Sequence, residues 1–195
     1  MAEPLLAALD LETTGLSQTD GHRIVEVAVV IYGLESQREF GRFETQLNPE
    51  RGIDPKAQAV HGIGYDELIG KPLWGSIAPK LSALLSRCQY VLAHNGEGFD
   101  APFLWGEFLR AGVSLPSVRL IDSMLLGRWA TPDGAVPNLG ALCFACDVPY
   151  DKALAHRAAY DVECMAACFF MQHKHGFFPL PTEPYHFVAQ KAKVK

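Results

Sequence analysis

The chain has 195 residues, of which 49% are hydrophobic and 20% charged, so it is long enough for one domain with a sizeable core and too apolar to be disordered. Its net charge of −5 argues against a broad basic face that grips nucleic acid, but leaves room for a small acidic site that attracts metal ions. The sequence contains neither a bilayer-length apolar run nor a secretory signal at MAEPLLAALD, which predicts a cytoplasmic protein with no membrane partner.

The first half of the chain predicts strands followed by helices. Three β-branched or alternating segments indicate an antiparallel meander. Two later segments have helical features, and the second of them has a clear apolar stripe. These strands are expected at residues 5–12, 22–32 and 38–47, and the helices at 53–63 and 76–88.

The second half alternates short strands with helices. The strands are expected at residues 90–95 and 118–122, and the helices at 99–113, 123–129, 138–146 and 157–172. This order predicts an α/β fold, in which a mixed sheet is antiparallel at first and parallel later, with helices on both faces. We expect one domain over residues 1–175 and a loosely packed tail, rich in proline and lysine, over 176–195.

The five cysteines indicate reduced thiols, because their number is odd and no secretory signal precedes them. Cys143 and Cys146 form a C-x-x-C, and Cys164 and Cys168 lie one helical turn apart, so a four-thiolate zinc site is one interpretation. The other is that they pack as small apolar side chains on helices. The second is favoured, because the segment NLGALCFACDV is apolar and has no turn residue between its cysteines.

The stretch ALDLETTGL places two acids on one predicted strand. Asp10 and Glu12 share a face, about 7 Å apart, and Leu9 and Leu11 point to the other face. Two like charges are costly to bury unless a cation lies between them, and carboxylates are natural ligands of Mg²⁺ and Mn²⁺. The alternative is a solvated strand end with two surface acids.

Three other polar residues have simple structural explanations when each is considered alone. Asp100 precedes a helix and suits an N-cap. Asp161 fits an exposed acid on a helix, and His156 a surface or capping histidine. Glu26 lies in an apolar strand and fits a structural acid with satisfied hydrogen bonds.

Taken together and in order, these segments resemble a known family. The matching stretches are LDLETTGL, HRIVEVAVV, NPERGIDPKAQAVHGI, YVLAHNGEGFDAPFL, RLIDSMLLGR and AHRAAYDVECMA, over roughly residues 5–173. They resemble the motifs of the DnaQ-like, or DEDDh, 3′–5′ exonucleases of the ribonuclease H-like superfamily. Each motif is weak alone, but the ordered set is specific.

The resemblance implies a set of catalytic residues. Asp10, Glu12, Asp100 and Asp161 would hold two Mg²⁺ or Mn²⁺ ions, and His156 would be the general base. Paired divalent ions stabilise the charge that develops when a phosphodiester is hydrolysed. A histidine, with an ordinary pKa of about 6.5, can take a proton near neutral pH.

The resemblance also implies contacts with the substrate. Thr13, Thr14 and Leu16 match a stretch that touches the terminal nucleotide, and His61 and Asn95 match positions that line the substrate groove. Turn formation is the alternative for Thr14. Buried hydrogen bonding is the alternative for His61 and Asn95.

The sequence therefore predicts a metal-dependent 3′–5′ exonuclease that releases nucleoside 5′-monophosphates from single-stranded nucleic acid. The six-residue step from His94 to Asp100 resembles the TREX-type branch, which trims single-stranded DNA and is dimeric, so DNA is slightly favoured and a homodimer is one option. The alternatives are a proofreading or accessory subunit docked to a polymerase or repair complex, an RNA-trimming enzyme, and an inactive binding module. The five polar positions disfavour the last.

Overall fold

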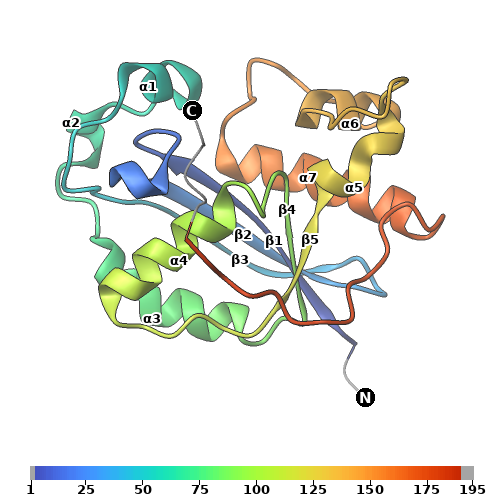
Figure 1. Cartoon of the computed structure of the whole chain (residues 1–195), viewed down its shortest axis with the longest axis horizontal. Coiled ribbons are helices and arrows are strands. Elements are labelled where there is room, and N and C mark those ends of the chain that lie inside the picture. The colour runs from blue at the N-terminus through green and yellow to red at the C-terminus, as the bar shows by residue number, and fades with distance from the viewer. Residues whose placement is uncertain (1–2, 190–195) are drawn as a thin grey trace.

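The computed structural model describes residues 3–189 and has a five-stranded mixed sheet at its centre, with helices on both faces (Figure 1). The strand order is β3-β2-β1-β4-β5. β1 pairs antiparallel with β2 and parallel with β4, which confirms the predicted change from an antiparallel to a parallel arrangement. The strands are β1 (Leu5–Thr13), β2 (Ile24–Gly33), β3 (Glu39–Gln46), β4 (Tyr90–Ala93) and β5 (Arg119–Asp122).

The helices lie close to the predicted segments, with three short additions. The four-residue helix α2 and the 3₁₀-helices η1 and η2 are too short to produce a hydrophobic period, so the sequence did not predict them as separate elements. Within residues 3–189, no helix is both long and apolar enough to cross a bilayer. The helices are η1 (Gln18–Asp20), α1 (Pro55–His61), α2 (Tyr65–Leu68), α3 (Trp74–Leu85), α4 (Asp100–Ala111), α5 (Ser123–Leu126), η2 (Gly127–Ala130), α6 (Leu139–Ala145) and α7 (Ala158–His173).

Side chains of β1 alternate between two cores, one on each face of the sheet. Leu9 and Leu11 belong to the first core, which α3 and α4 complete with residues such as Phe103. Leu6 and Ala8 belong to the second core, which α6 and α7 complete. Figure 1 shows α3 and α4 below the sheet and α7 above it. Because β1 is central and buried on both faces, its carboxyl end is held rigidly.

The fold brings the carboxyl ends of β1 and β4 side by side. These parallel neighbours are paired over Leu6–Ala8 of β1 and Tyr90–Leu92 of β4. The chain leaves β1 towards β2 on one side of the sheet, and returns as β4 on the other. Such a switch point is where open α/β sheets form their binding crevices. Both of the first two predicted motifs leave the sheet here.

The segment 176–189, expected as part of a loosely packed tail, is mostly exposed, but two of its aromatic side chains pack on the cores. Phe178 is fully buried in the second core, and Phe187 packs against the first. Between them, the amide of Tyr185 donates to the carbonyl of Val118 at 2.7 Å, beside the edge strand β5. Prolines prevent a helix here but do not prevent aromatic anchors from docking. The last six residues of the predicted tail lie outside the described part of the chain.

All five cysteines are buried and free. Cys143, Cys146, Cys164 and Cys168 line the second core, where α6 meets α7. The sulfur atoms of Cys143 and Cys168 are 3.6 Å apart. The four side chains pack as small apolar groups, as the favoured interpretation of the sequence predicts.

Candidate active site

β1 places two carboxylates at its carboxyl end. Leu9 and Leu11 lie in the core below the sheet, so Asp10 and Glu12 face the opposite side, which α7 covers, as predicted. Asp10 is partly exposed, whereas Glu12 is only 8% exposed. Glu12 is therefore not a surface acid at a solvated strand end, which was the alternative interpretation.

α4 contributes the third carboxylate. Asp100 is the first residue of this helix, and Phe99 occupies the N-cap position, so the N-cap interpretation of Asp100 is wrong. Asp100 is 2% exposed, and its Oδ1 atom is buried without a hydrogen-bond partner among the described residues. A buried carboxylate oxygen without a donor is costly. The carboxylate of Asp100 therefore fits a position that a cation completes.

A second buried acid holds the loop that leads from β4 to α4. Asp122 accepts hydrogen bonds from the amides of Asn95 at 3.2 Å and Glu97 at 2.9 Å. It also caps α5 through the amides of Met124 and Leu125. Asn95 has a positive φ of 67°, and these hydrogen bonds to Asp122 stabilise that conformation. Sequence reasoning missed Asp122, although an aspartate between a strand and a helix is the typical signal of an N-cap.

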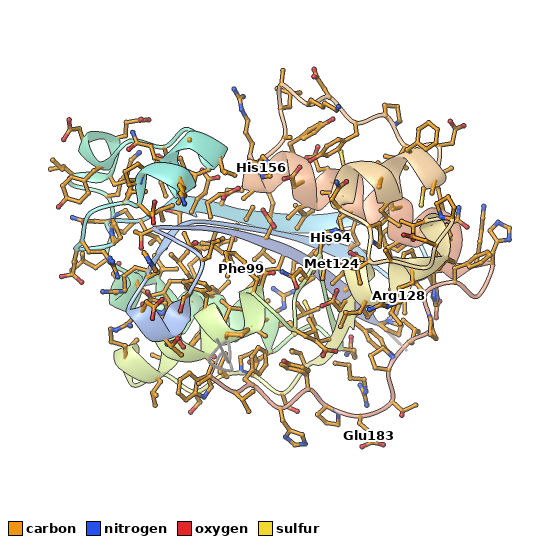
Figure 2. The ribbon with its side chains drawn as sticks, turned by 45° about the horizontal axis from the view of Figure 1, so that its top comes forward. His94, Phe99, Met124, Arg128, His156 and Glu183 are labelled. Atoms are coloured by element: carbon orange, nitrogen blue, oxygen red, sulfur yellow. The ribbon has the colours of Figure 1, made fainter. Side chains whose placement is uncertain are left out.

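α7 contributes the fourth carboxylate. Asp161 is 8% exposed, so the interpretation as an exposed helix acid is wrong. Its Oδ1 accepts the hydroxyl of Tyr150 at 3.0 Å, and its Oδ2 accepts the backbone amide of His156 at 3.0 Å. His156 has a positive φ of 62° and is exposed at the start of α7 (Figure 2).

The carboxylates do not form a ready-made metal site. Over residues 3–189, no set of three or more histidine, cysteine, aspartate or glutamate side chains is arranged to hold an ion directly. Both oxygens of Asp161 are engaged by Tyr150 and by the amide of His156. Asp161 would have to exchange at least one of these partners to bind a cation.

The electrostatics of this cluster nevertheless favour a cation. Burial and then repulsion by Asp161 and Glu26 raise the pKa of Asp10 well above its ordinary value. Burial, Asp10 and its other carboxylate neighbours raise the pKa of Glu12 to about 10. Burial and Asp10 similarly raise the pKa of Asp100. Divalent ions such as Mg²⁺ and Mn²⁺ prefer such oxygen ligands and would relieve the repulsion, so these residues fit a divalent metal centre.

Glu26 is a fifth carboxylate in this cluster. It lies directly opposite Glu12 in the pairing of β1 with β2. Its side chain accepts from Gln46 Nε2 at 3.3 Å and from the amide of Ala158, the first residue of α7, at 3.4 Å. The interpretation as a partnered structural acid is correct, but sequence reasoning missed that Glu26 lies beside the catalytic candidates. The N-cap residue Arg157 makes no side-chain cap, so Glu26 acts as the cap of α7.

The turn after β1 has a mainly structural conformation. Thr14 is fully buried, and its hydroxyl accepts from the amide of Arg23 at 3.0 Å and shares a hydrogen bond of 3.0 Å with His22 Nδ1. These bonds hold the turn, as the turn-forming alternative for Thr14 expects. The hydroxyl of Thr13 donates to the carbonyl of Gly15 at 2.7 Å, which tightens the same turn. Leu16 is 76% exposed at its tip.

His61 also makes internal hydrogen bonds. Its Nδ1 accepts from the amide of Ile63 at 3.0 Å, so its Nε2 carries the proton and donates to the carbonyl of Thr13 at 3.2 Å. Burial lowers the pKa of His61, which favours this neutral form. His61 thus ties the end of α1 to the turn after β1, and the hydrogen-bonding alternative describes its nitrogens.

A cleft of about 490 Å³ opens beside these residues. It lies between β2, β3, the α1–α2 segment and the start of α7. Its walls carry Glu26, His61, His156 and Arg157. The cleft therefore gives a bound molecule access to the exposed His156.

Comparisons with known proteins show that this chain is similar to exonucleases. The RNase_T family model, described as an exonuclease, matches residues 7–169. The DNA polymerase III subunit epsilon of Escherichia coli (strain K12) is 31% identical over 170 residues, which cover 83% of this chain and 68% of that protein.

Solved exonuclease structures have a similar fold. E. coli exonuclease I in complex with a dA16 oligonucleotide superposes with a TM-score of 0.74 at 18% identity, over 88% of this chain and 41% of that chain. Exonuclease X in complex with 5′ overhanging duplex DNA superposes with a TM-score of 0.63 at 24% identity, over 88% of this chain and 93% of that one. The chain thus spans less than half of the exonuclease I chain.

Proposed function

Because this chain belongs to the RNase_T exonuclease family, among the DnaQ-like 3′–5′ exonucleases of ribonuclease H-like fold, we propose that it trims single-stranded nucleic acid from the 3′ end. The products are nucleoside 5′-monophosphates, and DNA is preferred to RNA. One observation carries this proposal. The four candidate carboxylates come from three separate elements, yet they lie close enough to interact: Asp10, Asp100 and Asp161 all raise the pKa of Glu12.

The four carboxylates would hold two divalent ions, Mg²⁺ or Mn²⁺. Such ions lower the pKa of an attacking water and stabilise negative charge on a phosphodiester undergoing hydrolysis. The unpartnered oxygen of Asp100 supports this assignment. Asp161 joins the set once it releases Tyr150 or the amide of His156.

The remaining roles fall to residues outside the carboxylate set. His156 is exposed, and its backbone amide donates to Asp161, so we assign to its ring the role of taking a proton from the attacking water. Leu16 offers an exposed apolar side chain to the terminal base. Thr13, His61 and Asn95 act mainly by fixing the backbone around the terminal nucleotide.

A time course on 5′-labelled oligonucleotides tests the proposal. Single-stranded DNA should shorten stepwise with Mg²⁺ or Mn²⁺, faster than duplex DNA or RNA, and should stay intact with a chelator. Asp10→Ala and Asp161→Ala should remove nearly all hydrolysis, and His156→Ala should flatten the rise of activity with pH at saturating metal. Degradation from the 5′ end, or wild-type turnover in either aspartate variant, would refute the assignment.

A second candidate role is that of a proofreading subunit docked to a polymerase. The similarity to the polymerase III epsilon subunit favours it. The test is to purify the chain with the replicative polymerase of its own organism, and to compare the rates at which paired and mispaired 3′ ends are trimmed. Faster removal of mispaired ends within a stable complex would support this role.

A homodimer and a cytoplasmic location stay predictions. Light scattering can test the first, and cell fractionation the second.

A further inference from the structure

A second pocket lies beside the segment that links β1 to β2 and is lined by Gly21 and Arg23 of that segment. Its volume is about 530 Å³, and three of its lining residues are arginines: Arg23, Arg51 and Arg110. Among the described residues that line it, the only acid is Glu50. The chain has a net charge of −5, yet three guanidinium groups surround this one hollow.

One buried carboxylate orients two of these arginines. Glu107 is 2% exposed and accepts from Arg23 Nε at 2.5 Å and Arg23 Nη2 at 3.1 Å. It also pairs with Arg110 Nη1 at 2.8 Å. Because one carboxylate is shared by two guanidinium groups, the trio of Glu107, Arg23 and Arg110 keeps a charge of +1.

The third arginine adds to this surplus. Arg51 donates to the backbone carbonyl of Asp20 at 3.3 Å and makes no ion pair within the described part of the chain. Glu50 lies 3.7 Å from Arg23 but is 54% exposed, so solvent screens its charge. Each guanidinium has five N–H donors, and the hydrogen bonds of these arginines within residues 3–189 use two donors of Arg23 and one each of Arg51 and Arg110.

The pocket is coupled to the candidate active site by short backbone contacts. The amide of Thr14 donates to the carbonyl of Arg23 at 2.8 Å, so the backbone of one pocket residue is bonded directly to the turn after β1. α4 connects the two sites as well, with Asp100 at its start and Arg110 near its end. At 1.5 Å per residue these two positions are about 15 Å apart, a span of a few nucleotides.

We propose that this arginine pocket binds a backbone phosphate of the nucleic acid, a few nucleotides away from the bond that is hydrolysed. The planar guanidinium fork matches the geometry of a phosphate, and pre-orientation by Glu107 reduces the entropic cost of binding. The inference rests on the proposed function and adds to it a second contact, which favours long substrates over single nucleotides. The phosphate belongs either to the trimmed strand or to the opposite strand of a recessed duplex.

The test uses the double variant Arg51→Ala/Arg110→Gln, because Arg23→Ala would leave Glu107 buried with a weaker partner. The substrates are an oligothymidylate long enough to reach the pocket, a recessed duplex, and the p-nitrophenyl ester of thymidine 5′-monophosphate, which has no neighbouring phosphodiester. We expect the KM of the long substrates to rise about three- to tenfold. The slope of log KM against log salt should become shallower by about 1 for each arginine–phosphate pair that the variant removes.

The controls separate this inference from the proposed function. Arg87→Ala removes an exposed arginine at the end of α3 and should leave all three KM values unchanged. An equal rise in KM for the ester and the long substrates, or no rise at all, would refute phosphate binding in the pocket but not the exonuclease activity. A wild-type chain that hydrolyses none of the substrates would overturn both. A rise with both long substrates assigns the phosphate to the trimmed strand, and a rise with the duplex alone assigns it to the opposite strand.

Discussion

At the scale of single residues, the candidate site combines groups that destabilise one another. Asp10, Glu12 and Asp100 each have a raised pKa because each is shielded from water and lies near other carboxylates. Function explains such a cluster better than stability does, since an apolar replacement would avoid the repulsion.

This repulsion predicts how the stability of the metal-free protein depends on pH. A carboxyl group with a raised pKa holds its proton longer in the folded state than in the unfolded chain, so stability falls as pH rises from about 4 towards the folded value. Asp10→Asn should therefore raise the free energy of unfolding near pH 8 by about 1–3 kcal/mol, with a smaller gain at pH 5. Thermal melts with a chelator measure the difference.

Divalent ions provide the matched control for that prediction. Mg²⁺ or Mn²⁺ should raise the melting temperature of the wild type more than that of the variant. Equal melting curves for the two proteins at both pH values would show that the carboxylates do not interact as described.

At the scale of elements, the site depends on how α7 is joined to the sheet. Glu26 of β2 accepts the amide of Ala158 and so fixes the first turn of α7, which carries Asp161. Asp122 has a similar role for α4, because it accepts hydrogen bonds from backbone amides of the loop before that helix. The half-buried Glu26 and the buried Asp122 thus orient the two helices that supply half of the proposed metal ligands.

Variants of Glu26 test whether it acts by position or by charge. Glu26→Gln keeps an acceptor for Ala158 and should retain kcat within about threefold, whereas Glu26→Ala should lose about 10- to 100-fold. Glu44→Ala, an exposed acid that lines the same cleft, is the control and should have no effect. Equal losses in Glu26→Gln and Glu26→Ala, measured at saturating metal, would mean that the charge matters rather than the hydrogen bond.

Much of this arrangement could be predicted from the sequence, because it follows from local pattern. The alternation of β1 predicts that Asp10 and Glu12 share a face, and the apolar stripes predict α3 and α7 within a few residues. The position of Glu26 could not be predicted, since it depends on the register between β1 and β2. The bonds of Asp161 to Tyr150 depend on a loop conformation that has no periodic signal.

At the scale of the whole molecule, the C-terminal segment joins the two cores. It runs from Phe178 in the second core, past the edge strand β5, to Phe187 against the first core (Figure 1). This segment protects an open sheet edge and is part of the fold. Deleting residues 176–195 would therefore disturb folding as well as any docking function.

A pair of neighbouring phenylalanines tests this role. Phe178 is fully buried, and Phe178→Ala should lower the free energy of unfolding by about 3–5 kcal/mol. Phe177 is 45% exposed and packs on Trp129, so Phe177→Ala should cost clearly less. Denaturant titrations measure both. A similar loss of unfolding free energy in the two variants would contradict the role of Phe178 as the residue that anchors this segment.

The crowded acids around Glu12 also imply an exchange between this protein and its surroundings. At neutral pH the folded chain retains hydrogen ions that free aspartate and glutamate would release, since the pKa of Glu12 is about 10. Each divalent ion that enters must expel some of them, so loading the centre acidifies the medium. A lower pH would then release the metal ions and a higher pH would favour their binding. The fraction of protein with metal bound therefore depends on pH and on metal concentration before any nucleic acid binds.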